Sequence, residues 1–176
     1  MPSSSKPQPI EQIDCSLIWD EINEIEFIQD VRELTQGSPH GAAIKIPLRS
    51  PAYTGNSINE MFAAWFERMD TSDTEYVKAA ENTMLLVYEV MESLGYSKVF
   101  RVMVVMLPPH GEVEPHCDEG SYSNSVDRYH LVIGGDCTWN DSKMEAGWLY
   151  KVPHLDNHHI VAGDIGRTAL IMDFSN

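Results

Sequence analysis

The most constraining feature of the sequence is the residue pattern after Gly95, where short runs of β-branched and apolar residues are separated by turn residues. The first run, Lys98–Leu107, is rich in valine and methionine and predicts a buried strand, which Pro108 and Pro109 would end. Several short strands with turns between them are typical of a sandwich or a barrel. The further strands are expected at Glu112–His116, Arg128–Ile133, Gly147–Val152, His158–Val161 and Thr168–Phe174.

The first half of the chain has a different pattern, in which apolar residues recur at helical spacing. The isoleucines and other apolar residues of Ile22–Leu34 predict a one-faced helix that ends at Gly37. A longer helix is predicted at about Thr74–Leu94, with Gly95 as its C-cap. Between these two helices we expect, in order, a strand, a capping box and the apolar stripe of a helix: Gly41–Leu48, Ser57–Glu60 and Met61–Met69.

Together these patterns predict a mainly β protein of the α+β class. A chain of 176 residues is long enough for one domain with a sizeable core. The architecture that fits best is a double-stranded β-helix, which is a jelly-roll or cupin-like barrel, with N-terminal helices packed on one side. We expect residues 1–9 to be a flexible lead and residues 10–176 to be a single domain. Within it, residues 10–95 would form a mostly helical support and residues 96–176 the jelly-roll core that carries the site.

Charge and composition exclude several classes of function. The formal net charge of −15 should repel nucleic acid and anionic membranes. No apolar run approaches the roughly 20 residues that span a bilayer, and the first nine residues lack the apolar segment of a signal peptide. The three cysteines, Cys15, Cys117 and Cys137, do not form a disulfide framework. Reduced thiols and a cytoplasmic location are the simplest interpretation.

The histidines are the first indication of a metal site, because six of the seven lie between His110 and His159. In a strand, residues two apart point to the same face, so His116 and Asp118 can present an imidazole and a carboxylate to one point. His158 and His159 are the candidates for a third ligand. Two histidines and one carboxylate form the facial triad of non-haem Fe(II) oxygenases, although zinc also accepts this set and an isolated His-x-Asp can be a surface turn.

Arginines are the candidates for binding an anion near that metal. Arg167 opens the apolar C-terminal strand, and a buried arginine is costly without a partner, which could be Asp164 or an anionic ligand. Arg128 and His130 share a face by the same spacing of two, unless that face is the solvent side of an edge strand. Zinc has no redox chemistry, so an anion site beside the metal favours iron over zinc.

The segment from about residue 100 to residue 174 resembles the aspartyl/asparaginyl β-hydroxylase family of Fe(II)- and 2-oxoglutarate-dependent oxygenases. The family pattern contains Pro-His-x-Asp or Pro-His-x-Gly, Arg-x-His, a glycine-containing turn, His-x-Val, and an arginine followed by an apolar strand ending in aspartate. The matching segments, in order, are Pro115–Asp118, Arg128–Leu131, Glu145–Gly147, His158–Val161 and Arg167–Asp173.

The resemblance implies that His116 and His158 ligate Fe(II), with Asp118 at a position where some members have a carboxylate and others a glycine. Counting from Gly147 to the distal histidine also favours His158 over His159.

The resemblance further implies that Arg128, His130 and Arg167 hold the cosubstrate 2-oxoglutarate. The implied reaction uses O2, hydroxylates an unactivated C–H bond, and releases succinate and CO2. A small molecule or free amino acid is the expected substrate.

Acidic residues near the expected mouth of the barrel would suit an amine-bearing substrate, or they form a solvated rim: Glu112, Glu114, Glu119 and Asp127. Two other classes of function stay open. One is a cupin-like isomerase or cosubstrate-free dioxygenase, which would not need Arg167. The other is a non-enzymatic jelly-roll binding module.

Overall fold

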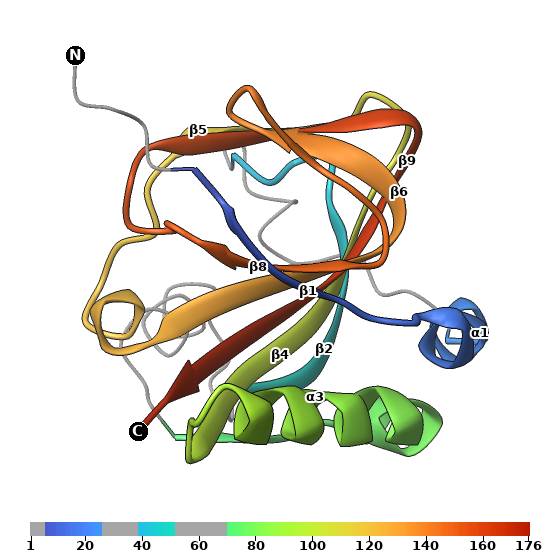
Figure 1. Ribbon diagram of the computed structural model, residues 1–176, viewed down its shortest axis with the longest axis vertical. Helices are drawn as coiled ribbons and strands as arrows, with labels where there is room; N and C mark the ends of the chain where they lie inside the picture. Colours follow the sequence, from blue (N-terminus) through green and yellow to red (C-terminus); the bar gives the residue numbers. More distant parts are fainter. Residues whose placement is uncertain (1–5, 26–38, 52–69) are drawn as a thin grey trace, which may run out of the picture.

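The computed structural model of the protein describes residues 6–25, 39–51 and 70–176. In these residues it has two α-helices, two 3₁₀ helices and nine strands, and every strand pairing is antiparallel (Figure 1). The helices are α1 (Ser16–Asn23), η2 (Glu75–Ala79), α3 (Glu81–Ser93) and η3 (Ser123–Ser125). The strands are β1 (Gln8–Gln12), β2 (Ile44–Pro51), β3 (Thr71–Asp73), β4 (Lys98–Leu107), β5 (Glu112–His116), β6 (Asp127–Trp139), β7 (Ser142–Met144), β8 (Trp148–Val152) and β9 (His158–Ser175).

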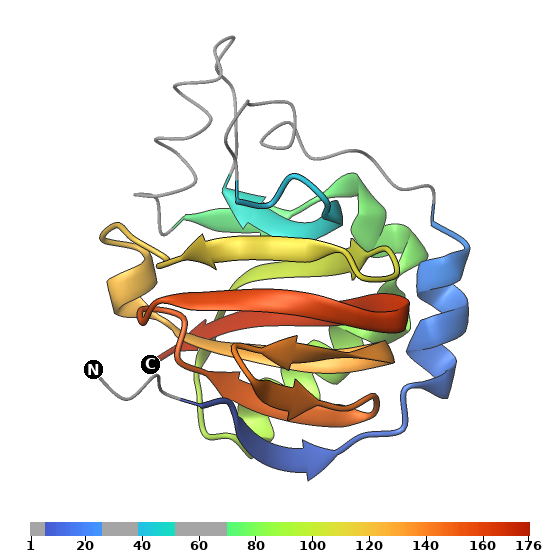
Figure 2. The ribbon, with the colours of Figure 1, turned by 90° about the horizontal axis from the view of Figure 1, so that it is seen from above.

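The strands form a double-stranded β-helix of two layers, as the sequence predicted. Their order is β1-β8-β6-β9-β4-β2-β3, with β5 paired to β9 and β7 paired to β6. The long strands β6 and β9 bend and run through both layers, which joins the layers into one barrel (Figure 1). Figure 2 shows β5 and the first part of β9 side by side in the upper layer, where the ends of these two strands carry the candidate site.

Two glycines let β6 and β9 bend together. Gly135 of β6 and Gly166 of β9 both have positive φ, +71° and +83°. A Cβ on Gly135 would lie 2.0 Å from the carbonyl oxygen of Gly166, so the two backbones can approach this closely only without a side chain there. For this reason β9 continues through the bend as one strand, whereas the sequence predicted two strands, His158–Val161 and Thr168–Phe174.

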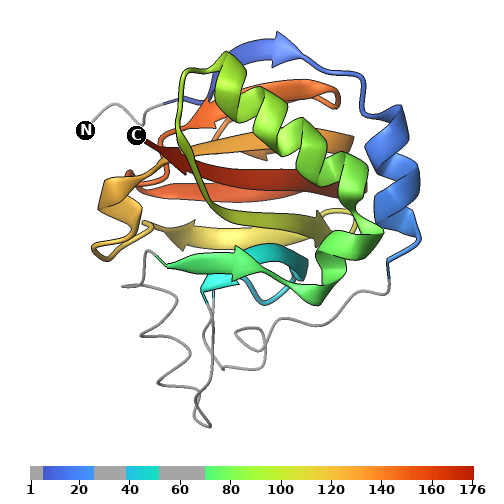
Figure 3. The same cartoon turned by 90° about the horizontal axis from the view of Figure 1, so that it is seen from below.

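The sheet buries both of its faces, which explains the nearly unbroken apolar run of β4. Alternate residues such as Val102 and Val104 pack with the isoleucines of α1 and the apolar face of α3. Met103 and Val105 instead belong to a second cluster inside the barrel. Figure 3 shows α3 lying across the outer face of the lower layer, with α1 at its edge. The predicted helical flank on one side of the jelly roll is therefore confirmed.

The N-terminal half departs from the prediction of a mostly helical support, because β1, β2 and β3 all join the sheet. Residues 1–9 were expected to be a flexible lead, but Gln8 and Pro9 pair with Lys151 and Tyr150 of β8. The prediction of a flexible lead is therefore wrong for Gln8 and Pro9.

The predicted helix at Thr74–Leu94 is divided at Ala80, whose φ of −134° is not helical. There the carboxylate of Glu21, from α1, accepts hydrogen bonds from the backbone N–H groups of Asn82 and Thr83 at 2.8 Å each. Glu21 thus satisfies the first orphan donors of α3 and fixes where that helix begins. At the other end Gly95 has φ of +80°, as its predicted role as a C-cap requires.

The other early helices can be compared only in part. Helix α1 spans Ser16–Asn23, so it begins before the expected start at Ile22. The rest of that predicted helix up to Gly37, and the predicted capping box and stripe of Ser57–Met69, lie outside the described residues.

Candidate metal centre

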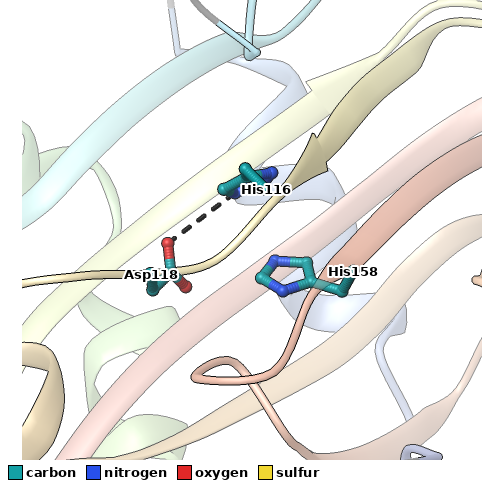
Figure 4. Close-up of side chains that lie close together, drawn as sticks. All are labelled: His116, Asp118 and His158. Atoms are coloured by element: carbon teal, nitrogen blue, oxygen red, sulfur yellow. Dashed lines mark ion pairs between the residues drawn. The ribbon is translucent and has the colours of Figure 1, made fainter. Parts of the chain in front are cut away.

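The candidate metal site lies where the end of β5 meets the start of β9. His116 and His158 are directly paired in the register of these two strands, and Asp118 follows two residues after His116. The backbone N–H of Asp118 donates to the carbonyl of His154 at 3.0 Å, which holds the turn after β5. One ligand atom from each of His116, Asp118 and His158 lies within 4.8 Å of the others (Figure 4). The structure therefore brings together the three predicted ligands.

Each imidazole is oriented so that Nε2 is left for a metal. Nδ1 of His116 lies 2.8 Å from the carbonyl oxygen of Glu114, and Nδ1 of His158 lies 2.9 Å from that of Asp156. A carbonyl can only accept, so the proton sits on Nδ1 and the lone pair on Nε2. Burial lowers the pKa of His158 to about 4, so this ring is neutral at pH 7, as a metal ligand must be.

His159 takes no part in this cluster. Its Nδ1 lies 3.1 Å from Oδ1 of Asn140, which also accepts the backbone N–H of His159 at 3.0 Å. Successive residues of a strand point to opposite faces, so only one of the two neighbouring histidines can face His116 and Asp118. The structure places His158 there.

Asp118 is held by Arg128, whose side chain is 11% exposed. Its Oδ2 accepts from Arg128, while its Oδ1 lies 3.7 Å from Nε2 of His116. Burial alone would raise the pKa of Asp118, but the positive charge of Arg128 is the largest influence in the opposite direction, and the pKa lies below its ordinary value. One carboxylate oxygen is thus fixed by Arg128, and the other faces the two histidines.

Arg128 itself was predicted to hold the cosubstrate, and the structure gives it different partners. Its Nε and second terminal nitrogen donate to the two oxygens of Asp173 at 2.7 and 2.8 Å, and the remaining terminal nitrogen donates to Asp118. Asp173 is fully buried and also accepts from the hydroxyl of Tyr122 at 2.8 Å. Two carboxylates neutralise the guanidinium, so we revise its role to that of positioning Asp118.

This cluster makes a clear prediction for stability. Asp173→Asn removes one of the two carboxylate charges on the guanidinium of Arg128 and leaves that of Asp118, which should lower the free energy of unfolding by about 3 kcal/mol, the low end for a broken buried pair. Asp73→Asn is the matched control, because Asp73 is exposed and its pair with the half-buried Arg49 should contribute at most about 1 kcal/mol. Urea unfolding of the three proteins compares them, and equal losses for the two variants would contradict this account of Asp173.

Arg167 and His130, both predicted to hold the cosubstrate, lie together inside the barrel. Arg167 is 2% exposed and its guanidinium is 2.8 Å from Nδ1 of His130. Burial, and then the charge of Arg167, holds the pKa of His130 well below its ordinary value. The neutral ring accepts at Nδ1, so its proton is on Nε2. The solvent-face alternative for His130 is wrong, because β6 lies between β8 and β9.

The guanidinium of Arg167 has no carboxylate within 4.0 Å in the described part of the chain. Asp164, the alternative partner considered from the sequence, is exposed and lies 3.9 Å from His110 instead. The Nε–H of Arg167 and the Nε1–H of Trp139 are both buried and have no hydrogen-bond partner among the described residues. Buried donors and a buried cation that lack partners are costly, so the side chains of Arg167 and Trp139 are suited to an anionic ligand.

Sequence reasoning missed two residues of the site, Trp139 and His40, and gave no role to Asp173, which entered only as the last residue of the matching segment Arg167–Asp173. Trp139 stacks on the ring of His158, with centroids 4.2 Å apart and planes 11° apart, and His40 contacts the ring of His116 edge-on at 4.7 Å. Trp139 lies beyond the predicted strand Arg128–Ile133, and His40 lies far from the other histidines in the sequence. Their places in the site depend on long-range contacts, which leave no local signal in the sequence.

The acidic rim is less favourable to an amine than the sequence suggested. Asp127 is paired with Lys151 at 2.8 Å, so its charge is already compensated. Glu112, Glu114 and Glu119 are exposed. No helix in the described ranges is long and apolar enough to cross a membrane, and Cys15, Cys117 and Cys137 are free thiols.

Comparison with known proteins places the fold. No protein-family model matches the sequence, and no curated protein sequence matches it. Among solved structures, an oxidoreductase of the 2OG-Fe(II) oxygenase family from Burkholderia pseudomallei superposes with a TM-score of 0.58 at 10% identity, over 92% of this chain and 77% of that chain. The likeness is one of fold, and it supports the double-stranded β-helix.

More distant similarities include a prolyl-4-hydroxylase from Pseudomonas putida, with a TM-score of 0.44 at 14% identity over 92% of this chain and 83% of that one. A sugar phosphate isomerase of the cupin superfamily from Silicibacter pomeroyi has a TM-score of 0.40 at 14% identity, over 88% and 74% of the two chains.

Proposed function

We propose that this protein is an Fe(II)- and 2-oxoglutarate-dependent oxygenase that hydroxylates an unactivated C–H bond of a small molecule. The observation that carries the proposal is the pairing of two features in one barrel. A His-Asp-His cluster lies at the end of β5 and the start of β9, and a buried arginine lies further along β9, with no carboxylate partner among the described residues. A metal enzyme that needs no anionic cosubstrate would have no use for Arg167.

The donor set supports iron as the metal. His116, Asp118 and His158 supply two neutral nitrogens and one carboxylate oxygen, which is the facial triad that leaves three positions open on Fe(II). Arg128 occupies Oδ2 of Asp118, so the carboxylate would bind through Oδ1 alone. Zinc accepts the same ligands, but it lacks the redox chemistry that an oxygenase needs.

The interior residues support the cosubstrate. A chain of contacts leads inward from the cluster: His158 stacks on Trp139, Trp139 meets the ring of His130 at 5.5 Å, and His130 accepts from Arg167. In the proposed complex, Arg167 binds the distal carboxylate of 2-oxoglutarate and His130 fixes the plane of the guanidinium. The apolar cluster around them keeps water away.

When bound together, Fe(II) and 2-oxoglutarate supply the activation of O2 that oxidises a C–H bond, with release of succinate and CO2. The protein contributes the ligand set, the orientation of both carboxylates and a dry interior. The resemblance to the aspartyl/asparaginyl β-hydroxylase family is consistent with these separate roles of the bound groups and the protein. A free amino acid or another small molecule, acted on in the cytoplasm, remains our proposal for the substrate.

The test is a screen of candidate metabolites for succinate formed from 2-oxoglutarate. The proposed oxygenase forms succinate in proportion to substrate consumed, and only with Fe(II) present. A cupin-like isomerase or a cosubstrate-free dioxygenase would convert a substrate without succinate. A non-enzymatic binding module would show no turnover with any compound.

The carboxylate of Asp118 predicts the outcome of the reaction. Iron halogenases of this broad class have a small residue at this position, which gives a halide room to bind. With Asp118 in place we expect hydroxylation, or desaturation as a lesser outcome, and no chlorination even with chloride present. Mass spectrometry of the product formed under ¹⁸O2 measures this, and incorporated chlorine would overturn the assignment of Asp118.

A further inference from the structure

We propose that Trp139 is a cosubstrate-binding residue, whose indole N–H donates a hydrogen bond to the distal carboxylate of 2-oxoglutarate beside Arg167. The inference rests on the proposed function and adds a residue that neither the sequence pattern nor the resemblance singled out. It also explains why an indole, rather than another large apolar ring, stands at the end of β6.

The first argument is the unmet hydrogen bond of the indole. Trp139 is 1% exposed, and its Nε1–H has no partner in the described part of the chain. The indole N–H can only donate, and buried tryptophans usually find a partner for it. Leaving a buried donor unmet is unfavourable, so its partner should be an acceptor that enters the barrel.

The second argument is position. The ring of Trp139 lies flat on His158 with centroids 4.2 Å apart, and it meets His130 edge-on at 5.5 Å. His130 in turn accepts from Arg167 at 2.8 Å. Trp139 therefore stands between a candidate iron ligand and the residue that fixes Arg167, which is where a ligand that reaches both would pass.

The third argument identifies the group that Trp139 meets. The keto-acid end of 2-oxoglutarate would use its oxygens on the metal, whereas the distal carboxylate offers about four acceptor positions. A bidentate arginine uses two of them. The remaining positions need further donors, and the free N–H of Trp139 is a second buried donor in this interior besides the Nε–H of Arg167.

The experiment compares Trp139→Phe with the control Trp148→Phe, which removes a half-buried tryptophan packed against the same interior cluster. Anaerobic calorimetric titrations measure the dissociation constants of Fe(II), and of 2-oxoglutarate on the Fe(II)-loaded protein. Phenylalanine can still cover His158 but has no N–H. We expect Trp139→Phe to weaken 2-oxoglutarate about tenfold while Fe(II) affinity is unchanged, and Trp148→Phe to change neither.

A second ligand identifies the carboxylate. 2-Oxovalerate has the same five-carbon chain as 2-oxoglutarate but ends in a methyl group. Trp139→Phe should bind 2-oxovalerate as well as the unaltered protein does, because the acceptor of the indole is missing from both complexes. An equal penalty for the two ligands would overturn the inference.

If Trp139→Phe fails to fold, a second variant that keeps the bicyclic ring of tryptophan tests the same inference. In a protein with phenylalanine at positions 19, 65 and 148, tryptophan is replaced during expression by benzothienylalanine, in which sulfur stands in place of the N–H. The loss for 2-oxoglutarate should again be about tenfold relative to the same protein with tryptophan at position 139.

The outcomes separate this inference from the proposed function. If the unaltered Fe(II)-loaded protein binds no 2-oxoglutarate, the proposed function is wrong and the inference fails with it. If the unaltered protein binds 2-oxoglutarate and the N–H-free variants bind it equally well, only the inference is wrong. A loss of Fe(II) affinity in Trp139→Phe would show that Trp139 merely supports His158, which also overturns the inference.

Discussion

His158→Ala should abolish tight Fe(II) binding, with a loss of at least about a hundredfold in affinity, because residues that only orient a ligand already cost ten- to a hundredfold. His158 supplies one of three protein ligands at the cluster with His116 and Asp118. Burial lowers the pKa of His158 to about 4, so the ring offers its lone pair at pH 7 without releasing a proton. Anaerobic calorimetry measures the effect.

The neighbouring histidine provides the matched control. His159→Ala removes the same side chain from the next residue of β9, but the imidazole there lies against Asn140 rather than at the cluster. We expect His159→Ala to bind Fe(II) like the unaltered protein, and His116→Ala to fail like His158→Ala. Loss of metal in His159→Ala with retention in His158→Ala would exchange the two assignments and contradict the register of β9.

Arg167→Lys should raise the dissociation constant of 2-oxoglutarate at least about tenfold, since a charged hydrogen bond contributes roughly 1.5–3 kcal/mol. Lysine keeps the positive charge but loses the planar fork that grips a carboxylate. It also cannot donate to His130 and to a ligand in the same plane, as the guanidinium can.

The control for Arg167→Lys is Arg49→Lys, at the half-buried arginine of β2 that pairs with the exposed Asp73. It should leave the binding of 2-oxoglutarate unchanged. Both variants are titrated anaerobically with Fe(II) present, so that a difference reports on the cosubstrate alone. An unchanged constant for Arg167→Lys would remove Arg167 from the site and restore the alternative of a cupin-like enzyme without a cosubstrate.

Local pattern was sufficient for strands whose ends are marked by turn residues. The predicted bounds of β4 and β5, Lys98–Leu107 and Glu112–His116, are those observed. His116 and Asp118 do come together as expected, but not as two residues of one strand: β5 ends at His116, and the turn that follows it carries Asp118 to the cluster. For the third ligand the sequence left two candidates, His158 and His159. The pairing of β5 with β9 places His158 opposite His116.

Long-range contacts could not be predicted in the same way. The turn-like residues before Arg167 predicted a break in β9, but Gly166 and Gly135 instead permit a shared bend. Arg128 was predicted to hold the cosubstrate, but its guanidinium binds Asp173. The register of β6 and β9 places Asp173 directly opposite Arg128, and that register is not visible in the local sequence. Trp139 lies beyond the predicted strand Arg128–Ile133, so no local pattern singled it out.

The central claim is that one barrel holds Fe(II) on the His-Asp-His cluster and 2-oxoglutarate on Arg167. A crystal structure of the protein grown without oxygen, with Fe(II) and 2-oxoglutarate, tests it most directly. The account predicts metal bound by His116, Asp118 and His158, with the distal carboxylate of 2-oxoglutarate on the guanidinium of Arg167. Metal bound elsewhere, or a filled cluster with no 2-oxoglutarate between it and Arg167, would contradict it.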